Sequence, residues 1–89
     1  MREQVIEDAV VTFAEGCGWL ARKMSYTGRR GCPDHWFFKG ARQIIIEFKK
    51  PGEKPDGVQL REHTRLHEHG FKVCVIDNIE AGKRLFTDA

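Results

Sequence analysis

Two acidic residues and a lysine occupy short segments whose composition suits metal-assisted chemistry on a phosphodiester. Asp34 ends the segment Gly-Cys-Pro-Asp, and Glu47 and Lys49 end the segment Ile-Ile-Ile-Glu-Phe-Lys. Carboxylate oxygens are the ligands that Mg²⁺ prefers, and a lysine can stabilise the negative charge that develops during hydrolysis. A Mg²⁺-dependent nuclease requires this combination of side chains.

The residues between the two segments predict a β-hairpin. Residues 35–39 and 42–46 are rich in aromatic and β-branched side chains, and they flank Gly40-Ala41. A glycine in the first position of a two-residue turn favours type II′, in which Lys39 would pair with Arg42.

This register places Asp34 directly opposite Glu47. Opposing side chains have Cβ atoms about 5 Å apart, where two like charges destabilise the sheet unless something compensates them. A divalent cation is the simplest compensation. Because strand side chains alternate between faces, Lys49 should point to the same face as Glu47.

A simpler interpretation of the same residues is structural. A Glu-x-Lys on a strand is commonly a solvated surface pair, and Pro-Asp is commonly a turn. However, Glu47 lies between Ile44-Ile45-Ile46 and Phe48, a run typical of a strand that is buried on both faces. Charges at the end of such a strand are costly without partners, which favours a functional site.

The chain has 89 residues, 40% of them hydrophobic and 31% charged, which predicts a single globular domain over residues 1–89. Its apolar runs are too short for a membrane span, and residues 1–4 begin a helix instead of a signal peptide. We therefore expect a cytosolic protein with no membrane partner.

The three cysteines are odd in number and widely spaced, which favours free thiols.

The net charge is only +2, but the basic residues are unevenly distributed. Six of them cluster in sequence around the candidate site, whereas the region before residue 9 is acidic. A basic rim around an acidic centre suits a phosphodiester backbone held beside metal-binding carboxylates. Besides Lys49, these candidate DNA-binding residues are Lys23, Arg29, Arg30, Lys50 and Lys54.

The hydrophobic pattern predicts the element order αβββαβα. The expected helices are 3–15, 58–69 and 79–86, and the further strands outside the hairpin are 19–25 and 71–76. A helix between two strands implies a parallel crossover, so the fold class is α/β: a small mixed sheet, made of a hairpin plus a parallel strand and flanked by helices on both faces.

The helix at 58–69 carries further candidates. Gln59 opens it and could reach a metal-bound water or a phosphate. His63 and His67 have the spacing of a zinc pair, but no third ligand is evident, and surface or half-buried histidines are the more common outcome.

Six bulky aromatic residues exceed what so small a core is expected to bury, which suggests a homodimer; they are Trp19, Trp36, Phe37, Phe38, Phe71 and Phe86.

Together these motifs resemble the virus-type replication-repair nuclease (VRR-NUC) family, a branch of the PD-(D/E)XK nucleases. The resemblance covers nearly the whole chain and rests on an ordered set: Ile6-Glu7, Arg30-Gly31-Cys32-Pro33-Asp34, Ile46-Glu47-Phe48-Lys49, Pro51-Gly52-Glu53-Lys54-Pro55, Gln59 and Gly70-Phe71-Lys72-Val73. It implies a restriction-endonuclease-like core, Mg²⁺ or Mn²⁺ as cofactor, and branched DNA such as four-way junctions as substrate. Stand-alone members of this length are associated with phages and form homodimers, which would place this protein in a bacterial host's cytosol.

By position, the resemblance assigns metal binding to Glu7, Asp34, Glu47 and the backbone carbonyl of Phe48. The catalytic set becomes Asp34 and Glu47 together with Lys49, which would orient or activate water, and Gln59, an accessory residue. Glu3, one turn before Glu7, is the weaker candidate for the same role. His35 replaces an arginine of many relatives, so no phosphate contact is carried over to it.

Two other classes of function are compatible with the chain. A nuclease-like fold could bind nucleic acid without cutting, but such a protein should have lost a carboxylate or the lysine. A small structural or interaction protein would leave the acidic face unexplained.

Overall fold

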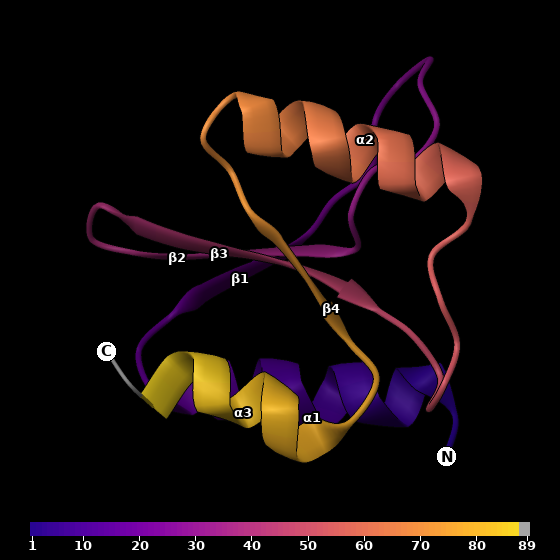
Figure 1. Ribbon diagram of the computed structural model, residues 1–89. Coiled ribbons are helices and arrows are strands. Elements are labelled where there is room, and N and C mark those ends of the chain that lie inside the picture. Colours follow the sequence, from indigo (N-terminus) through magenta and orange to yellow (C-terminus); the bar gives the residue numbers. More distant parts are fainter. Residues whose placement is uncertain (88–89) are drawn as a thin grey trace.

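A four-stranded sheet lies between helices in the computed structural model, which describes residues 1–87 (Figure 1). The elements in chain order are α1 (Glu3–Gly16), β1 (Leu20–Lys23), β2 (His35–Lys39), β3 (Arg42–Phe48), α2 (Gly57–Glu68), β4 (Val73–Ile76) and α3 (Ile79–Thr87). The predicted α/β class and the order αβββαβα are confirmed. The predicted domain extends to residue 89, and residues 88–89 lie outside the described part.

The strands are arranged in the order β1-β2-β3-β4. β1 and β3 run antiparallel to β2, and β4 runs parallel to β3. Lys39 pairs with Arg42, as predicted, and Gly40 has a φ of 60°, a left-handed conformation that the first turn position of a II′ hairpin requires. The hairpin register therefore brings the ends of β2 and β3 together as expected.

The two faces of the sheet are covered differently (Figure 1). α2 connects the parallel strands β3 and β4 and lies on one face, whereas α1 and α3 pack side by side on the other. The main core lies under α1 and α3, where α1 contributes Ile6, Val10 and Ala14 at four-residue spacing. The sheet and α3 contribute the rest of this core: Trp19, Phe37, Ile46, Phe48, Ile76 and Phe86.

Close packing of α1 against α3 depends on Gly82. A Cβ atom at this position would lie 2.5 Å from Val10 Cγ2, so only a glycine lets the two helices approach to this distance. α1 is thereby fixed against the sheet, and its N-terminal turn is held near the end of β3.

The aromatic residues divide into two groups. Trp19, Phe37 and Phe86 are at most 4% exposed and belong to the core, so less apolar surface is left for a partner than the sequence predicted. One chain buries them because Phe86 of α3 packs edge-on against both Trp19 and Phe37. Trp36 and Phe38 remain half-buried, and Phe71 is exposed.

Two strands are shorter than predicted. β4 begins at Val73 because the preceding residues end α2: Gly70 adopts a left-handed φ of 91°, and the Phe71 amide donates to the Leu66 carbonyl at 2.8 Å.

The three cysteines are free thiols, as expected. Within residues 1–87, the helices are too short or too polar to cross a membrane.

Candidate active site

Asp34 and Glu47 meet where β2 begins and β3 ends. The last ladder pair is His35 with Ile46, so Asp34 and Glu47 are the next residues of the two strands. Asp34 is anchored by its Oδ2, which accepts a hydrogen bond of 2.8 Å from the Phe48 amide. The predicted apposition of the two carboxylates is confirmed by this register.

Glu47 is 1% exposed, and three side chains surround its carboxylate. Gln59 Nε2 donates to Oε2 at 3.2 Å, and Lys49 Nζ lies 4.0 Å from the same oxygen. His63 Nε2 approaches the other oxygen, Oε1, to 3.5 Å. The lysine therefore points to the same face as Glu47, as its position on the strand predicted.

The titration of Glu47 is strongly perturbed. Burial raises the pKa of Glu47, and the charge of Asp34 and a hydrogen bond to Asp34 raise it further, to about 8. Lys49 opposes this shift but does not cancel it. Without a cation, Glu47 therefore holds a proton around neutral pH, because two anions cannot be accommodated at this buried strand end.

The first turn of α2 positions Gln59. Asp56 caps the helix by accepting from the Gln59 amide at 2.9 Å, and the Gln59 side-chain oxygen accepts from the Asp56 amide at 3.0 Å. This reciprocal capping box fixes the side chain while leaving its Nε2 directed to Glu47. Gln59 thus contacts the carboxylate itself, a more direct connection than the sequence suggested.

The carboxylates of α1 lie in two different settings. Glu7 is 6% exposed, and its oxygens lie 3.3 Å from His35 Nδ1 and 3.5 Å from Lys23 Nζ. Glu3 lies one turn earlier on α1. Burial raises the pKa of Glu3, and the negative charge of Asp34 raises it further. Glu7 thus contacts a histidine and a lysine, whereas the charge of Asp34 affects the pKa of Glu3.

The donor set suits a divalent cation at Glu47. Glu47 Oε1 is buried and has no hydrogen-bond partner, so its lone pairs could bind an ion. In the part of the chain described, no group of three or more His, Cys, Asp or Glu side chains is arranged to hold an ion as it stands. The carboxylate pair is therefore a partial site, which an ion would have to complete with water, backbone carbonyl or rotated side chains.

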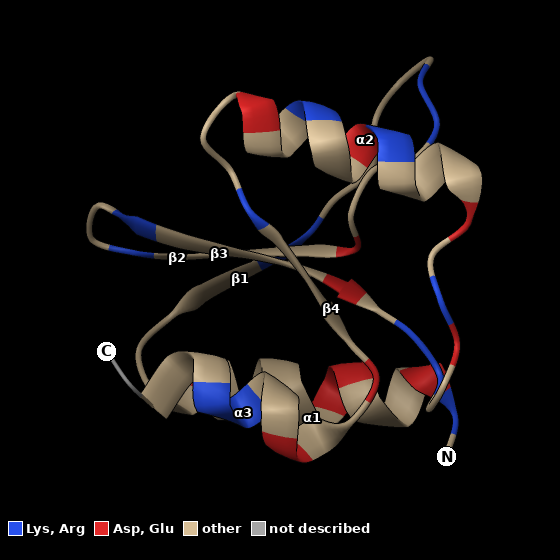
Figure 2. Ribbon diagram, viewed as in Figure 1, with Lys and Arg blue, Asp and Glu red and all other residues tan. Residues whose placement is uncertain are grey.

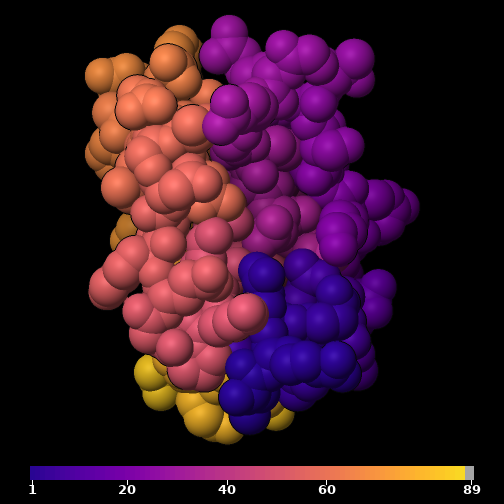
Figure 3. Space-filling model, turned by 90° about the vertical axis from the view of Figure 1, so that its right-hand side faces the viewer, coloured from indigo at the N-terminus to yellow at the C-terminus, as the bar shows by residue number. Residues whose placement is uncertain are grey.

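Basic side chains border this end of the sheet. Figure 2 shows acidic positions at the adjoining ends of β2 and β3 and basic residues in the loop that leaves β3. In Figure 3 the start of α1, the loop before α2 and the segment before β2 meet on one face of the molecule. The predicted DNA-binding residues are all exposed: Lys23, Arg29, Arg30, Lys50 and Lys54.

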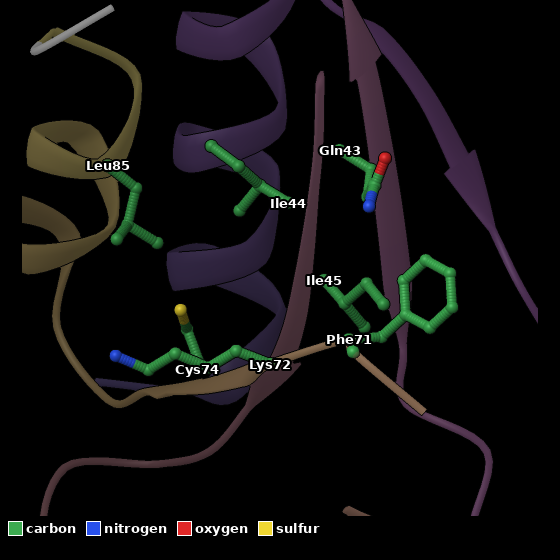
Figure 4. A pocket seen from close by; sticks show the side chains of 8 residues that line it. Gln43, Ile44, Ile45, Phe71, Lys72, Cys74 and Leu85 are labelled. Atoms are coloured by element: carbon green, nitrogen blue, oxygen red, sulfur yellow. The ribbon is translucent and has the colours of Figure 1, made fainter. Parts of the chain in front are cut away.

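A hollow elsewhere on the molecule has no carboxylate that could hold a metal ion. It encloses about 300 Å³ near the start of β3, and Figure 4 shows Leu85, Ile44 and Cys74 on one side of it and Phe71 on the other. Its one charged lining residue is Lys72, and it contains no acidic side chain. The carboxylate pair remains the candidate active site.

Comparisons with known proteins agree with this geometry. The chain is 42% identical over 79 residues to "Putative nuclease p44" of Acyrthosiphon pisum secondary endosymbiont phage 1, covering 88% of this chain and 85% of the relative. A solved structure described as a "VRR_NUC domain" superposes with a TM-score of 0.80 and 34% identity, over 93% of this chain and 91% of that one. The sequence matches no protein-family model.

The chain belongs to the VRR-NUC nuclease family. The fold that the family resemblance implied is thereby confirmed, including a mixed sheet flanked by helices. In this VRR-NUC chain the side chains of Asp34, Glu47, Lys49 and Gln59 converge, whereas the Glu7 carboxylate contacts other partners.

Two features of the VRR-NUC site were missed in the sequence. His63 lies against Glu47, although its position four residues after Gln59 places both on one face of α2 and could have revealed it. Glu62 is buried and accepts a 2.8 Å hydrogen bond from Tyr26, which ties the arginine-bearing loop to α2. Gly31 allows this contact, because a Cβ there would lie 3.1 Å from Glu62 Cβ.

The raised pKa of Glu47 predicts a pH-dependent stability in the metal-free VRR-NUC protein. Because the folded state holds the Glu47 proton more tightly, this contribution is present below the ordinary pKa of 4.5 and is lost as the pH rises through about 8. In EDTA, Glu47→Gln should therefore melt at least about 5 °C above the wild type at high pH and lose this advantage at low pH. A difference in melting temperature that is independent of pH would contradict the assignment.

Proposed function

We propose that this chain is a divalent-metal-dependent endonuclease that hydrolyses phosphodiester bonds in branched DNA, such as four-way junctions. The main support is the apposition of Asp34 and the buried Glu47, with Lys49 beside them. Membership of the VRR-NUC family supports nuclease activity. The choice of branched DNA rests on the family resemblance, as does action in the cytosol of a bacterial host.

Asp34 and Glu47 would hold Mg²⁺ or Mn²⁺, together with the backbone carbonyl of Phe48. The α1 ligand would be Glu7 or Glu3. Glu7 is the family counterpart, and the charge of Asp34 contributes to the raised pKa of Glu3. When bound, the ion would acidify water and polarise the scissile phosphate.

Lys49 and Gln59 would act around the ion. The Lys49 side chain is 13% exposed and lies close to Glu47, so its charge is weakly screened and directed at the place where a phosphate would be held. Gln59 bonds one oxygen of Glu47 and thereby leaves the other oxygen available. Gln59 is thus suited to orient the carboxylate that binds the ion.

The exposed basic residues would contact the DNA backbone. Arg29 and Arg30 lie on the loop that Tyr26 and Glu62 fasten to α2, and this attachment reduces the entropy lost on binding. Lys50 and Lys54 lie on the loop between β3 and α2. Lys23 ends β1 and lies within 3.5 Å of Glu7.

A cleavage assay tests the function. Labelled four-way junction, flap and duplex DNA of matched sequence should be incubated with the protein in Mg²⁺, Mn²⁺ or EDTA. We expect cleavage with either metal, preference for the branched DNAs, and no product in EDTA or with Glu47→Gln. Binding without cleavage in both metals would instead identify a nuclease-like binding module.

Two matched variants separate chemistry from binding in that assay. Lys49→Ala should lower the single-turnover rate at saturating DNA at least about a hundredfold with little change in affinity. Arg30→Ala should weaken binding and reduce its salt dependence, whereas Arg84→Ala on α3 is the control for simple loss of a positive charge. Normal cleavage by Lys49→Ala would remove the lysine from the mechanism.

We also propose that the protein acts as a two-fold homodimer. The apolar side chains left outside the core include Trp36, Phe38 and Phe71 together with Leu20, which pairs with Phe38 across β1 and β2. Strand alternation places Leu20, Trp36 and Phe38 on the face of the sheet that carries α2, where a second copy could cover them.

Light scattering during size-exclusion chromatography measures this state. We expect about twice the single-chain mass of 10.3 kDa at micromolar concentration. Phe38→Ser should shift the protein towards monomer, whereas Leu60→Ser, which changes an exposed residue of α2, should not. A wild-type mass near that of one chain would exclude the dimer.

A further inference from the structure

His63 and Glu47 present two buried polar atoms to each other without bonding. His63 Nε2 lies 3.5 Å from Glu47 Oε1, with side-chain exposures of 12% and 2%. Both atoms are inaccessible to solvent, and neither has a hydrogen-bond partner. Buried polar atoms are rarely left unsatisfied in native proteins, so this pair requires an explanation.

The chemistry of the two atoms indicates what would satisfy both. Both side chains can donate electron pairs to an ion. A neutral imidazole with its proton on Nδ1 presents a lone pair at Nε2, and a carboxylate oxygen presents lone pairs as well. An electrophile between two lone-pair donors would satisfy both atoms.

A proton alone explains the contact less well. A proton on Nε2 or on Oε1 would join the two atoms by a hydrogen bond, but they do not meet in hydrogen-bond geometry. A divalent ion needs ligand distances of about 2 Å to each donor, and atoms 3.5 Å apart can both reach an ion placed off the line between them.

We propose that His63 Nε2 is a nitrogen ligand of the divalent ion held by Glu47, and that the site therefore prefers Mn²⁺ to Mg²⁺. Mg²⁺ selects oxygen ligands, whereas imidazole is a common ligand of transition metals. The inference rests on the metal site of the proposed function and adds one residue and a metal preference to it. His67, one turn later on α2, is exposed and serves as the matched control.

Calorimetric titration of the EDTA-stripped, full-length protein with Mn²⁺ or Mg²⁺ measures the preference without DNA. We expect the wild type and His67→Gln to bind Mn²⁺ at least about tenfold more tightly than Mg²⁺. His63→Gln should lose most of that difference through weaker Mn²⁺ binding, while its Mg²⁺ affinity changes less than about threefold. Far-ultraviolet circular dichroism verifies that the variants are folded.

Electron paramagnetic resonance of the Mn²⁺-loaded protein gives a direct readout of the ligand. Electron spin-echo modulation from a bonded imidazole nitrogen should appear in the wild type and in His67→Gln and should be absent from His63→Gln. A wild-type spectrum without nitrogen coupling, or coupling that persists in His63→Gln, would overturn the proposal.

Glu47→Gln separates this inference from the function on which it rests. If Glu47→Gln abolishes metal binding but His63→Gln keeps the wild-type preference and spectrum, His63 is not a ligand and the metal site stands. If the wild type binds neither ion, or Glu47→Gln binds both ions normally, the metal site itself is wrong and the inference fails with it.

Discussion

Repulsion between Asp34 and Glu47 is the constraint around which this protein is organised. Two carboxylates at adjoining strand ends would destabilise an ordinary sheet, and burial of Glu47 makes the repulsion stronger. Neighbouring groups offset this repulsion. The Phe48 amide donates a hydrogen bond to Asp34, Gln59 donates one to Glu47 Oε2, and the Lys49 ammonium lies near the same oxygen. The remaining oxygen, Oε1, is buried near His63 of α2 and makes no hydrogen bond.

The parallel crossover explains why these partners come from α2. Because β4 runs parallel to β3, the chain must cross over between them, here through α2. The Asp56 cap begins this helix, and Gln59 in its first turn reaches Glu47 at the end of β3. Gln59 and His63 occupy successive turns of one face of α2, so both face Glu47. The same helix fastens the arginine loop through Glu62 and so couples the candidate DNA contacts to the site.

The sequence predicted those features that depend on local pattern. Strand alternation, the Gly40 turn and the register of Lys39 with Arg42 follow from short-range geometry, and they were sufficient to place Asp34 against Glu47. Features that depend on how the helices pack on the sheet could not be predicted from the sequence pattern. The positions of Glu7 beside His35 and of His63 beside Glu47 require the orientation of α1 and α2, which periodicity does not define. Similarly, burial of Trp19, Phe37 and Phe86 depended on how α3 packs.

Glu47 holds a proton around neutral pH, and we propose that a divalent ion replaces it. Because metal ligands must be deprotonated, binding at this carboxylate should release that proton. Calorimetric titration with Mn²⁺ at about pH 7, repeated in buffers of different ionisation enthalpy, measures the number released. We expect the wild type to release close to one proton per ion bound. Tight binding of Mn²⁺ with no proton release would contradict it.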